Sequence, residues 1–60
     1  MNDLEEGKTY RISTEGVSGT HTLFTGKLVG IGDIFLTIKN DKDGTVHIPK
    51  DKIFYIKEVN

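Results

Sequence analysis

The stretch Phe24–Asn40, FTGKLVGIGDIFLTIKN, determines the fold of this chain. Both of its halves are rich in β-forming residues, and Gly32-Asp33 separates them. In the second half the residues Ile34, Leu36 and Ile38 alternate with Phe35, Thr37 and Lys39. An alternation with a period of two indicates a strand with one buried face. The stretch therefore predicts two antiparallel strands joined by a tight turn.

Two glycines interrupt the first of these strands, which is expected to run from about Thr20 to Ile31. Gly26 and Gly30 fall on the same face as Phe24. Glycine inside a strand usually marks a sharp bend, a bulge or a close approach of two backbones. Both glycines are therefore predicted to be structural and to lie at bends of a long strand, where a side chain would collide with the neighbouring strand.

Further strands are expected on either side, over Lys8–Thr14, Thr45–Ile48 and Ile53–Val59. The segment NDKDG at 40–44 predicts a hairpin loop in which Gly44 supplies the left-handed residue. Pro49 cannot donate a backbone hydrogen bond to a sheet, so it should end its strand and open one helical turn. Residues 1–6 are polar and acidic and are expected to form a frayed end.

Five strands with tight turns, one of them long and bent, predict an all-β fold. The expected architecture is a small five-stranded, strongly bent antiparallel barrel of the Sm-like or SH3-like kind. Sixty residues make a single domain over 1–60. A five-stranded OB barrel is disfavoured, because it usually needs a longer chain and a helix between its third and fourth strands.

The same stretch resembles the Sm-like family, and its bacterial Hfq branch most of all. FTGKL at 24–28 fits the family pattern of apolar residue, spacer, Gly, spacer and apolar residue, and 34–40 fits the strand that follows. The segment Ile48–Ile53 falls where Hfq carries its Tyr-Lys-His motif. The resemblance covers about half of the chain. It implies a homo-oligomeric ring that binds single-stranded RNA.

The chain departs from the family pattern at residues that matter for RNA. Asp51 stands in place of the motif's histidine and Pro49 in place of its tyrosine. An acid at a position that would face phosphate disfavours RNA there. Ile34 falls at the base-stacking position, with Phe35 beside it. The RNA-binding candidates are Lys50, Lys27 and Phe35.

These departures leave a second hypothesis open, a protein-interaction or scaffolding barrel with no role in nucleic-acid binding. Eight basic and nine acidic residues give a net charge of −1, so RNA could be bound only through a local patch. A chain of this length buries only about 60% of the surface that its unfolded form exposes, so self-association should stabilise it. Phe54 and Tyr55 are adjacent, so at least one must face outward, toward a base or another subunit.

No arrangement of residues in the sequence predicts catalysis, so the protein is expected not to be an enzyme. His21 and His47 have no third ligand at metal-site spacing, and NDKDG lacks the 12-residue pattern of a calcium loop. No metal or cofactor is therefore predicted. The absence of cysteine, of a secretory pattern in MNDLEEGK and of long apolar runs predicts a cytoplasmic protein that does not enter a membrane.

Overall fold

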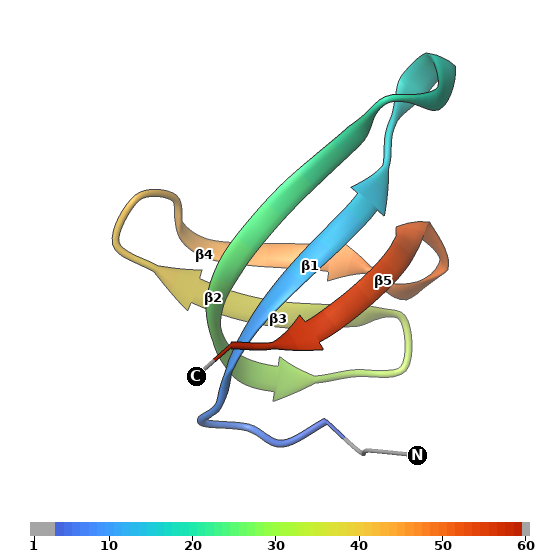
Figure 1. The fold of residues 1–60 in the computed structure, drawn as a ribbon. Helices are drawn as coiled ribbons and strands as arrows, with labels where there is room; N and C mark the ends of the chain where they lie inside the picture. Colours follow the sequence, from blue (N-terminus) through green and yellow to red (C-terminus); the bar gives the residue numbers. More distant parts are fainter. Residues whose placement is uncertain (1–3, 60) are drawn as a thin grey trace.

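The computed structural model describes residues 4–59, apart from the side chain of Val17, and confirms the all-β fold. Five antiparallel strands form one sheet in the order β4-β3-β2-β1-β5. The strands are β1 (Thr9–Glu15), β2 (His21–Ile31), β3 (Phe35–Asn40), β4 (Gly44–Pro49) and β5 (Ile53–Glu58). Two short 3-10 turns, η1 (Val17–Gly19) and η2 (Lys50–Lys52), precede β2 and β5. Figure 1 shows that the long strand β2 curves from its pairing with β1 to its pairing with β3, which bends the sheet on itself.

The bend of β2 depends on Gly26. A Cβ atom at Gly26 would lie 2.9 Å from the carbonyl oxygen of Lys39 and 3.2 Å from Cδ1 of Ile38. The register between β2 and β3 then shifts between Leu28 and Gly30, which is the signature of a β-bulge. The predicted close approach is confirmed at Gly26. The predicted collision is wrong at Gly30, which follows the register shift, because a Cβ there would meet that of Thr37 at an ordinary 3.4 Å.

The core is formed by the inward-facing residues of all five strands. Its buried members are Tyr10, Ile12, Leu28, Leu36, Ile38 and Ile48, and Leu4, Phe24, Val46, Ile53 and Ile56 pack against them. The alternation predicted for β1 and β3 is confirmed by this set, with the exception of Ile34. That residue lies before β3 and is exposed, because a hydrogen bond from the Gly32 amide to the Phe35 carbonyl (2.9 Å) closes the turn ahead of the strand.

The turn chemistry follows the sequence prediction closely. Gly44 has a φ of 74°, and the side-chain oxygen of Asn40 accepts a hydrogen bond from the Asp43 amide across the β3–β4 loop. Pro49 is the last residue of β4, where it pairs with Phe35, and the single turn η2 follows it. The expected strand ends differ from the observed ones by one residue at most positions.

The segment before β1 lies against the sheet from Leu4 onward, so it differs from the expected frayed end; residues 1–3 lie outside the described residues. Leu4 packs on the core, and the Glu5 amide donates a hydrogen bond to the Tyr10 hydroxyl at 2.9 Å. The Gly7 amide donates to the Leu28 carbonyl at 2.7 Å, which fixes this segment to β2. These contacts cover one end of the core with residues 4–8.

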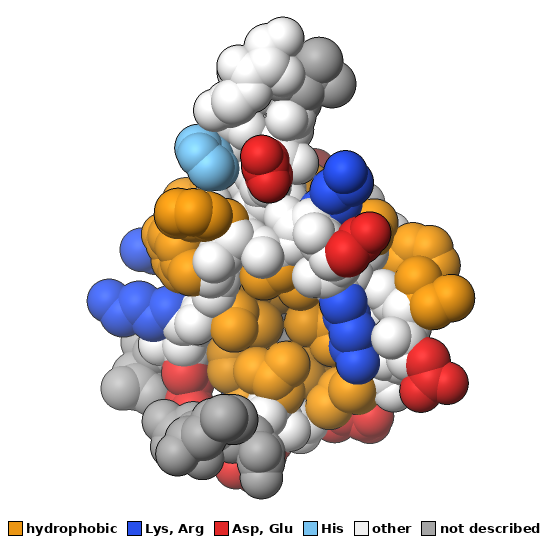
Figure 2. Space-filling model, turned by 90° about the vertical axis from the view of Figure 1, so that its right-hand side faces the viewer, with side chains coloured by type: hydrophobic (Ala, Val, Ile, Leu, Met, Phe, Trp, Pro, Cys, Tyr) orange, Lys and Arg blue, Asp and Glu red, His pale blue; other side chains and the backbone are white. Residues whose placement is uncertain are grey.

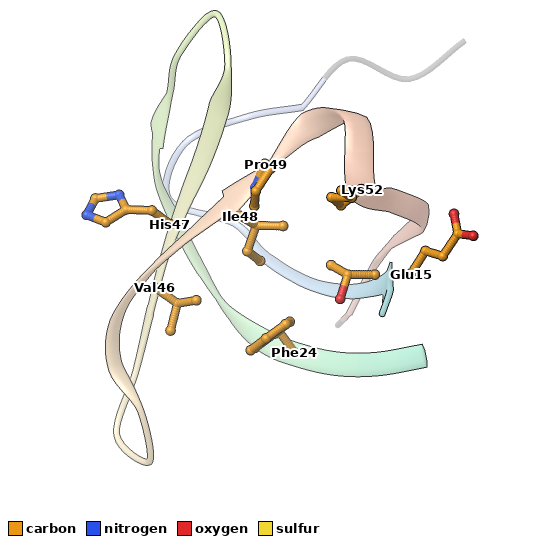
Figure 3. A pocket seen from close by; sticks show the side chains of 8 residues that line it. Glu15, Phe24, Val46, His47, Ile48, Pro49 and Lys52 are labelled. Carbon is orange, nitrogen blue, oxygen red and sulfur yellow. The ribbon is translucent and has the colours of Figure 1, made fainter. Parts of the chain in front are cut away.

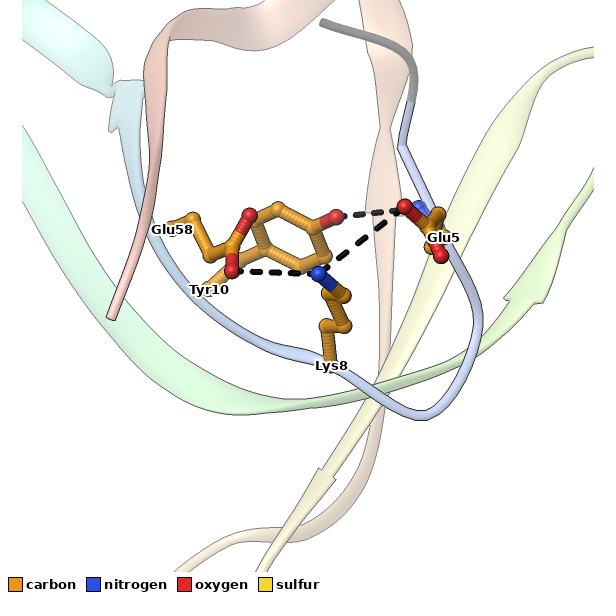
Figure 4. Close-up of polar contacts among 4 residues, drawn as sticks. All are labelled: Glu5, Lys8, Tyr10 and Glu58. Atoms are coloured by element: carbon orange, nitrogen blue, oxygen red, sulfur yellow. Dashed lines mark hydrogen bonds and ion pairs between the residues drawn. The ribbon is translucent and has the colours of Figure 1, made fainter. Parts of the chain in front are cut away.

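Two ion pairs of Lys8 link the segment before β1 to the edge strand β5 (Figure 4). Nζ of Lys8 lies 3.5 Å from a carboxylate oxygen of Glu58 and 3.9 Å from one of Glu5. The negative charges of Glu5 and then Glu58 raise the pKa of Lys8 above its ordinary 10.5. Because the folded-state pKa is raised, the contribution of Lys8 to stability is present below pH 10.5 and is lost as pH rises through the raised value.

Replacing Tyr10 by phenylalanine removes the hydroxyl that accepts the Glu5 hydrogen bond and leaves the ring in the core. The expected loss is about 0.5–1.5 kcal/mol in the free energy of unfolding. Tyr55→Phe is the matched control, because the Tyr55 hydroxyl forms no hydrogen bond within residues 4–59. Thermal unfolding of both variants tests the prediction, and equal midpoints for the two would contradict it.

Candidate nucleic-acid interface

The face of the sheet that points away from the core carries a continuous line of cations. In β1 this outer face is formed by Arg11 and Ser13, which alternate with the buried Tyr10 and Ile12. Arg11 lies directly opposite Lys57 of β5, and Lys27 of β2 lies directly opposite Lys39 of β3. Because Arg11 pairs with Thr25, Lys27 is its diagonal neighbour on the same face, about 7–8 Å away. We call these four residues, in the order Lys57, Arg11, Lys27 and Lys39, the cation line.

The acidic residues lie outside this line, and one of them, Glu58, directly follows Lys57 in β5. Among residues 4–59, the acids lie in loops, in turns or at strand ends: Glu5, Glu6, Glu15, Asp33, Asp41, Asp43, Asp51 and Glu58. Within the same part of the chain, the ion pairs are the two formed by Lys8, so no member of the cation line has a carboxylate partner. The outer face of the sheet is therefore locally positive, although the net charge of the whole chain is close to zero.

The cation line is costly for the free protein. Two like-charged pairs face each other directly across neighbouring strands, Arg11 with Lys57 and Lys27 with Lys39, and such pairs destabilise a sheet. Lysine is often placed on an edge strand to block further pairing, but only Lys57 lies on an edge, because β1, β2 and β3 are interior strands. Edge protection therefore does not account for three of the four cations.

The RNA-binding residues expected from the sequence fall into two separate places. Lys50 lies in η2, where its amide donates a hydrogen bond to the Ile34 carbonyl at 2.8 Å. Lys50 and Ile34 line a shallow hollow of about 260 Å³, and the other two residues that line it are Asp33 and Asp51. One lysine is thus accompanied by two carboxylates, which is an unfavourable setting for phosphate.

Lys27 and Phe35 are both exposed, but they do not lie together. Phe35 pairs with Pro49 at the start of β3, close to the η2 turn. Lys27 pairs with Lys39, four residues further along β3, which places it about 13 Å away along the strand. Phe35 therefore lies near Lys50, whereas Lys27 lies with Arg11, Lys39 and Lys57. Arg11, Lys39 and Lys57 were not among the RNA-binding residues predicted from the sequence.

An apolar cavity of about 220 Å³ opens beside the edge strand β4. Figure 3 shows Phe24, Val46 and Ile48 pointing into it, whereas His47 points away. Glu15 and Lys52 also line this cavity. Figure 2 shows a hollow lined by hydrophobic side chains on one face of the molecule, with charged side chains around it.

The two histidines occupy different strands and different surroundings. Nδ1 of His47 lies 2.9 Å from the Thr37 hydroxyl, and the ring of His21 lies 4.9 Å from that of Phe54. Within residues 4–59 no three metal-ligating side chains gather into a group that could hold an ion.

Comparison with protein-family models, curated proteins and solved structures finds no match to this chain. In the described part of the chain, no helix has the length and apolar character needed to cross a membrane.

Proposed function

We propose that the protein is a non-catalytic module that binds single-stranded RNA across the outer face of its sheet. The observation that carries the proposal is the cation line, in which four exposed cations on four adjacent strands have no carboxylate partner among the described residues 4–59. A phosphate chain laid along the line would relieve the repulsion between the two directly opposed pairs. Binding would therefore remove a destabilising feature of the free protein.

The shape of the line favours a single strand. The cations form one row that crosses three inter-strand steps of about 4.8 Å each, so the row can follow one phosphate chain. The same face carries exposed aromatic side chains beside Lys57, and aromatic rings with cations are the usual means of holding unpaired bases. The resemblance to the Sm-like family points in the same direction, although the proposed residues differ from the Lys50 position of that family.

The proposal is tested by measuring the affinity for oligo-U and oligo-A of about 12 nucleotides at several salt concentrations. A plot of log K against log salt should have a slope of about −2.8 per bound subunit, because each neutralised phosphate of a single strand contributes about −0.7. A duplex of equal length and single-stranded DNA of the same sequence are the comparison ligands. No detectable binding of either RNA at about 50 mM salt, where such contacts are strongest, would refute the proposal.

A scaffolding module is the second candidate, and the open edges of the sheet favour it. β4 and β5 end the strand order, and in the described chain each pairs with one neighbour only. The apolar cavity lies beside β4, so an added strand would cover both an open edge and apolar surface. A second copy of the chain is the simplest source of such a strand, which would give the homo-oligomer expected from the sequence.

If the chain self-associates, its melting midpoint should rise with protein concentration, because association stabilises the folded state by mass action. Light scattering at about 100 μM detects association with a micromolar Kd. A monomer at that concentration, with a midpoint that does not depend on concentration, would contradict self-association. That result would leave the RNA proposal standing, because the cation line lies within one subunit.

A further inference from the structure

Phe54 and Tyr55 lie on the same side of β5, although consecutive residues of a regular strand point to opposite faces. The cause is a β-bulge, because Ser13 pairs with Tyr55 and Thr14 pairs with Ile53, which leaves Phe54 as the extra residue. Phe54 is 67% exposed and Tyr55 is 47% exposed. The sequence prediction required one of the two to face outward, and the bulge turns both outward.

The two rings contact each other and the neighbouring His21. The ring centroids of Phe54 and Tyr55 lie 6.1 Å apart in an edge arrangement, and His21 lies 4.9 Å from Phe54 on the other side. Ser13 pairs with both Tyr55 and Leu23 on neighbouring strands and is only 6% exposed. We call His21, Phe54 and Tyr55 the aromatic cluster, because their rings form one continuous set of contacts.

The aromatic cluster continues the cation line. Tyr55 precedes Lys57 by two residues on the same face, a separation of about 7 Å along the strand. Arg11 lies opposite Lys57, so it is a diagonal neighbour of Tyr55. A phosphate held between Arg11 and Lys57 would leave its attached nucleotide within reach of the exposed rings.

We propose that the aromatic cluster is a base-stacking site for single-stranded RNA, placed at the β5 end of the cation line. This inference rests on the proposed function and adds to it a contact with the base, where the cation line contacts only phosphate. Charge complementarity selects this occupant, because Arg11 and Lys57 lie beside Tyr55 and neither has a carboxylate partner within residues 4–59. The acid nearest to the cluster along these strands is Glu15, which pairs with His21. Stacking is tolerant of sequence, since every base has a π-face.

The test compares two ligands of equal length, oligo-U and an abasic oligonucleotide that keeps the phosphates and lacks the bases. Phe54→Ala should weaken binding of oligo-U by about 5- to 150-fold, the usual effect of removing one stacking ring. It should leave the affinity for the abasic strand and the slope of log K against log salt unchanged. Tyr55→Leu removes a ring while keeping Ser13 covered, and Phe35→Ala is the matched control at an exposed phenylalanine outside the cluster.

Three other outcomes would refute the base-stacking site, and they differ in what they imply for the phosphate contacts. If the wild-type protein binds oligo-U and the abasic strand equally, or if Phe54→Ala and Phe35→Ala behave alike, the stacking site is refuted and the phosphate contacts stand. If Phe54→Ala instead lowers the mass in light scattering without changing RNA affinity, the cluster is a contact between subunits and the inference is wrong. If neither ligand binds the wild-type protein, the inference and the proposed function fail together.

Discussion

Replacing Gly26 by valine is expected to cost about 2 kcal/mol or more in the free energy of unfolding. The new Cβ would lie 2.9 Å from a backbone oxygen of β3, which cannot move aside as the end of a flexible side chain can. Overpacking of this kind typically costs about 1–3 kcal/mol. In a domain of this size about 2 kcal/mol lowers the melting midpoint by roughly 8–16 °C, which thermal unfolding measures directly.

The alanine substitutions Gly26→Ala and Gly30→Ala provide the matched comparison. Both add one methyl group to the same strand, but at Gly30 that group makes an ordinary 3.4 Å contact. Gly30→Ala should therefore leave the melting midpoint nearly unchanged or raise it slightly, because alanine restricts the unfolded chain more than glycine does. Equal losses in the two alanine variants would show that the close approach at Gly26 does not matter.

Neutralising half of the cation line should separate RNA affinity from protein stability. Lys27→Gln combined with Lys39→Gln removes one directly opposed pair. At about 0.1 M salt each neutralised phosphate of a single strand contributes about fivefold through counterion release, so the double variant should bind RNA about 25-fold more weakly. The same variant should be as stable as the wild type or more stable by a few tenths of a kcal/mol, because it relieves a like-charge pair.

The control for this result is Lys42→Gln combined with Lys50→Gln, which changes the net charge by the same amount. Lys42 lies in the β3–β4 loop and Lys50 in η2, both outside the cation line. RNA affinity should change by less than a few fold. Equal weakening by the two double variants would mean that the protein responds only to its net charge and that the cation line has no special role.

The fold could be predicted from the sequence because its main signals are local. The alternation of Leu36 and Ile38, the Asp-Gly loop that ends at Gly44 and the strand-ending Pro49 each depend on a few neighbouring residues. The close approach at Gly26 was predictable for the same reason. The surroundings of Gly30 could not be predicted, because they depend on a shift of register between β2 and β3 that no single strand specifies.

The candidate site was less accessible to sequence reasoning, because it is made by strand pairing. Alternation alone places Arg11 and Lys39 away from the core, but it does not reveal that Arg11 meets Lys57 or that Lys39 meets Lys27. The bulge at Phe54 also depends on the register between β1 and β5. Lys50 was selected by family resemblance, which compares positions along the chain and carries no information about the acids that surround it.

RNA bound along the cation line can be located by mapping amide chemical shifts during a titration with oligo-U. We expect the largest shifts on four adjacent strands, at Arg11, Lys27, Lys39, Tyr55 and Lys57. The amides of Ile34, Lys50 and Asp51 should move little. Shifts concentrated at Ile34, Lys50 and Asp51, with the outer face unchanged, would place the RNA at the η2 turn and refute binding along the cation line.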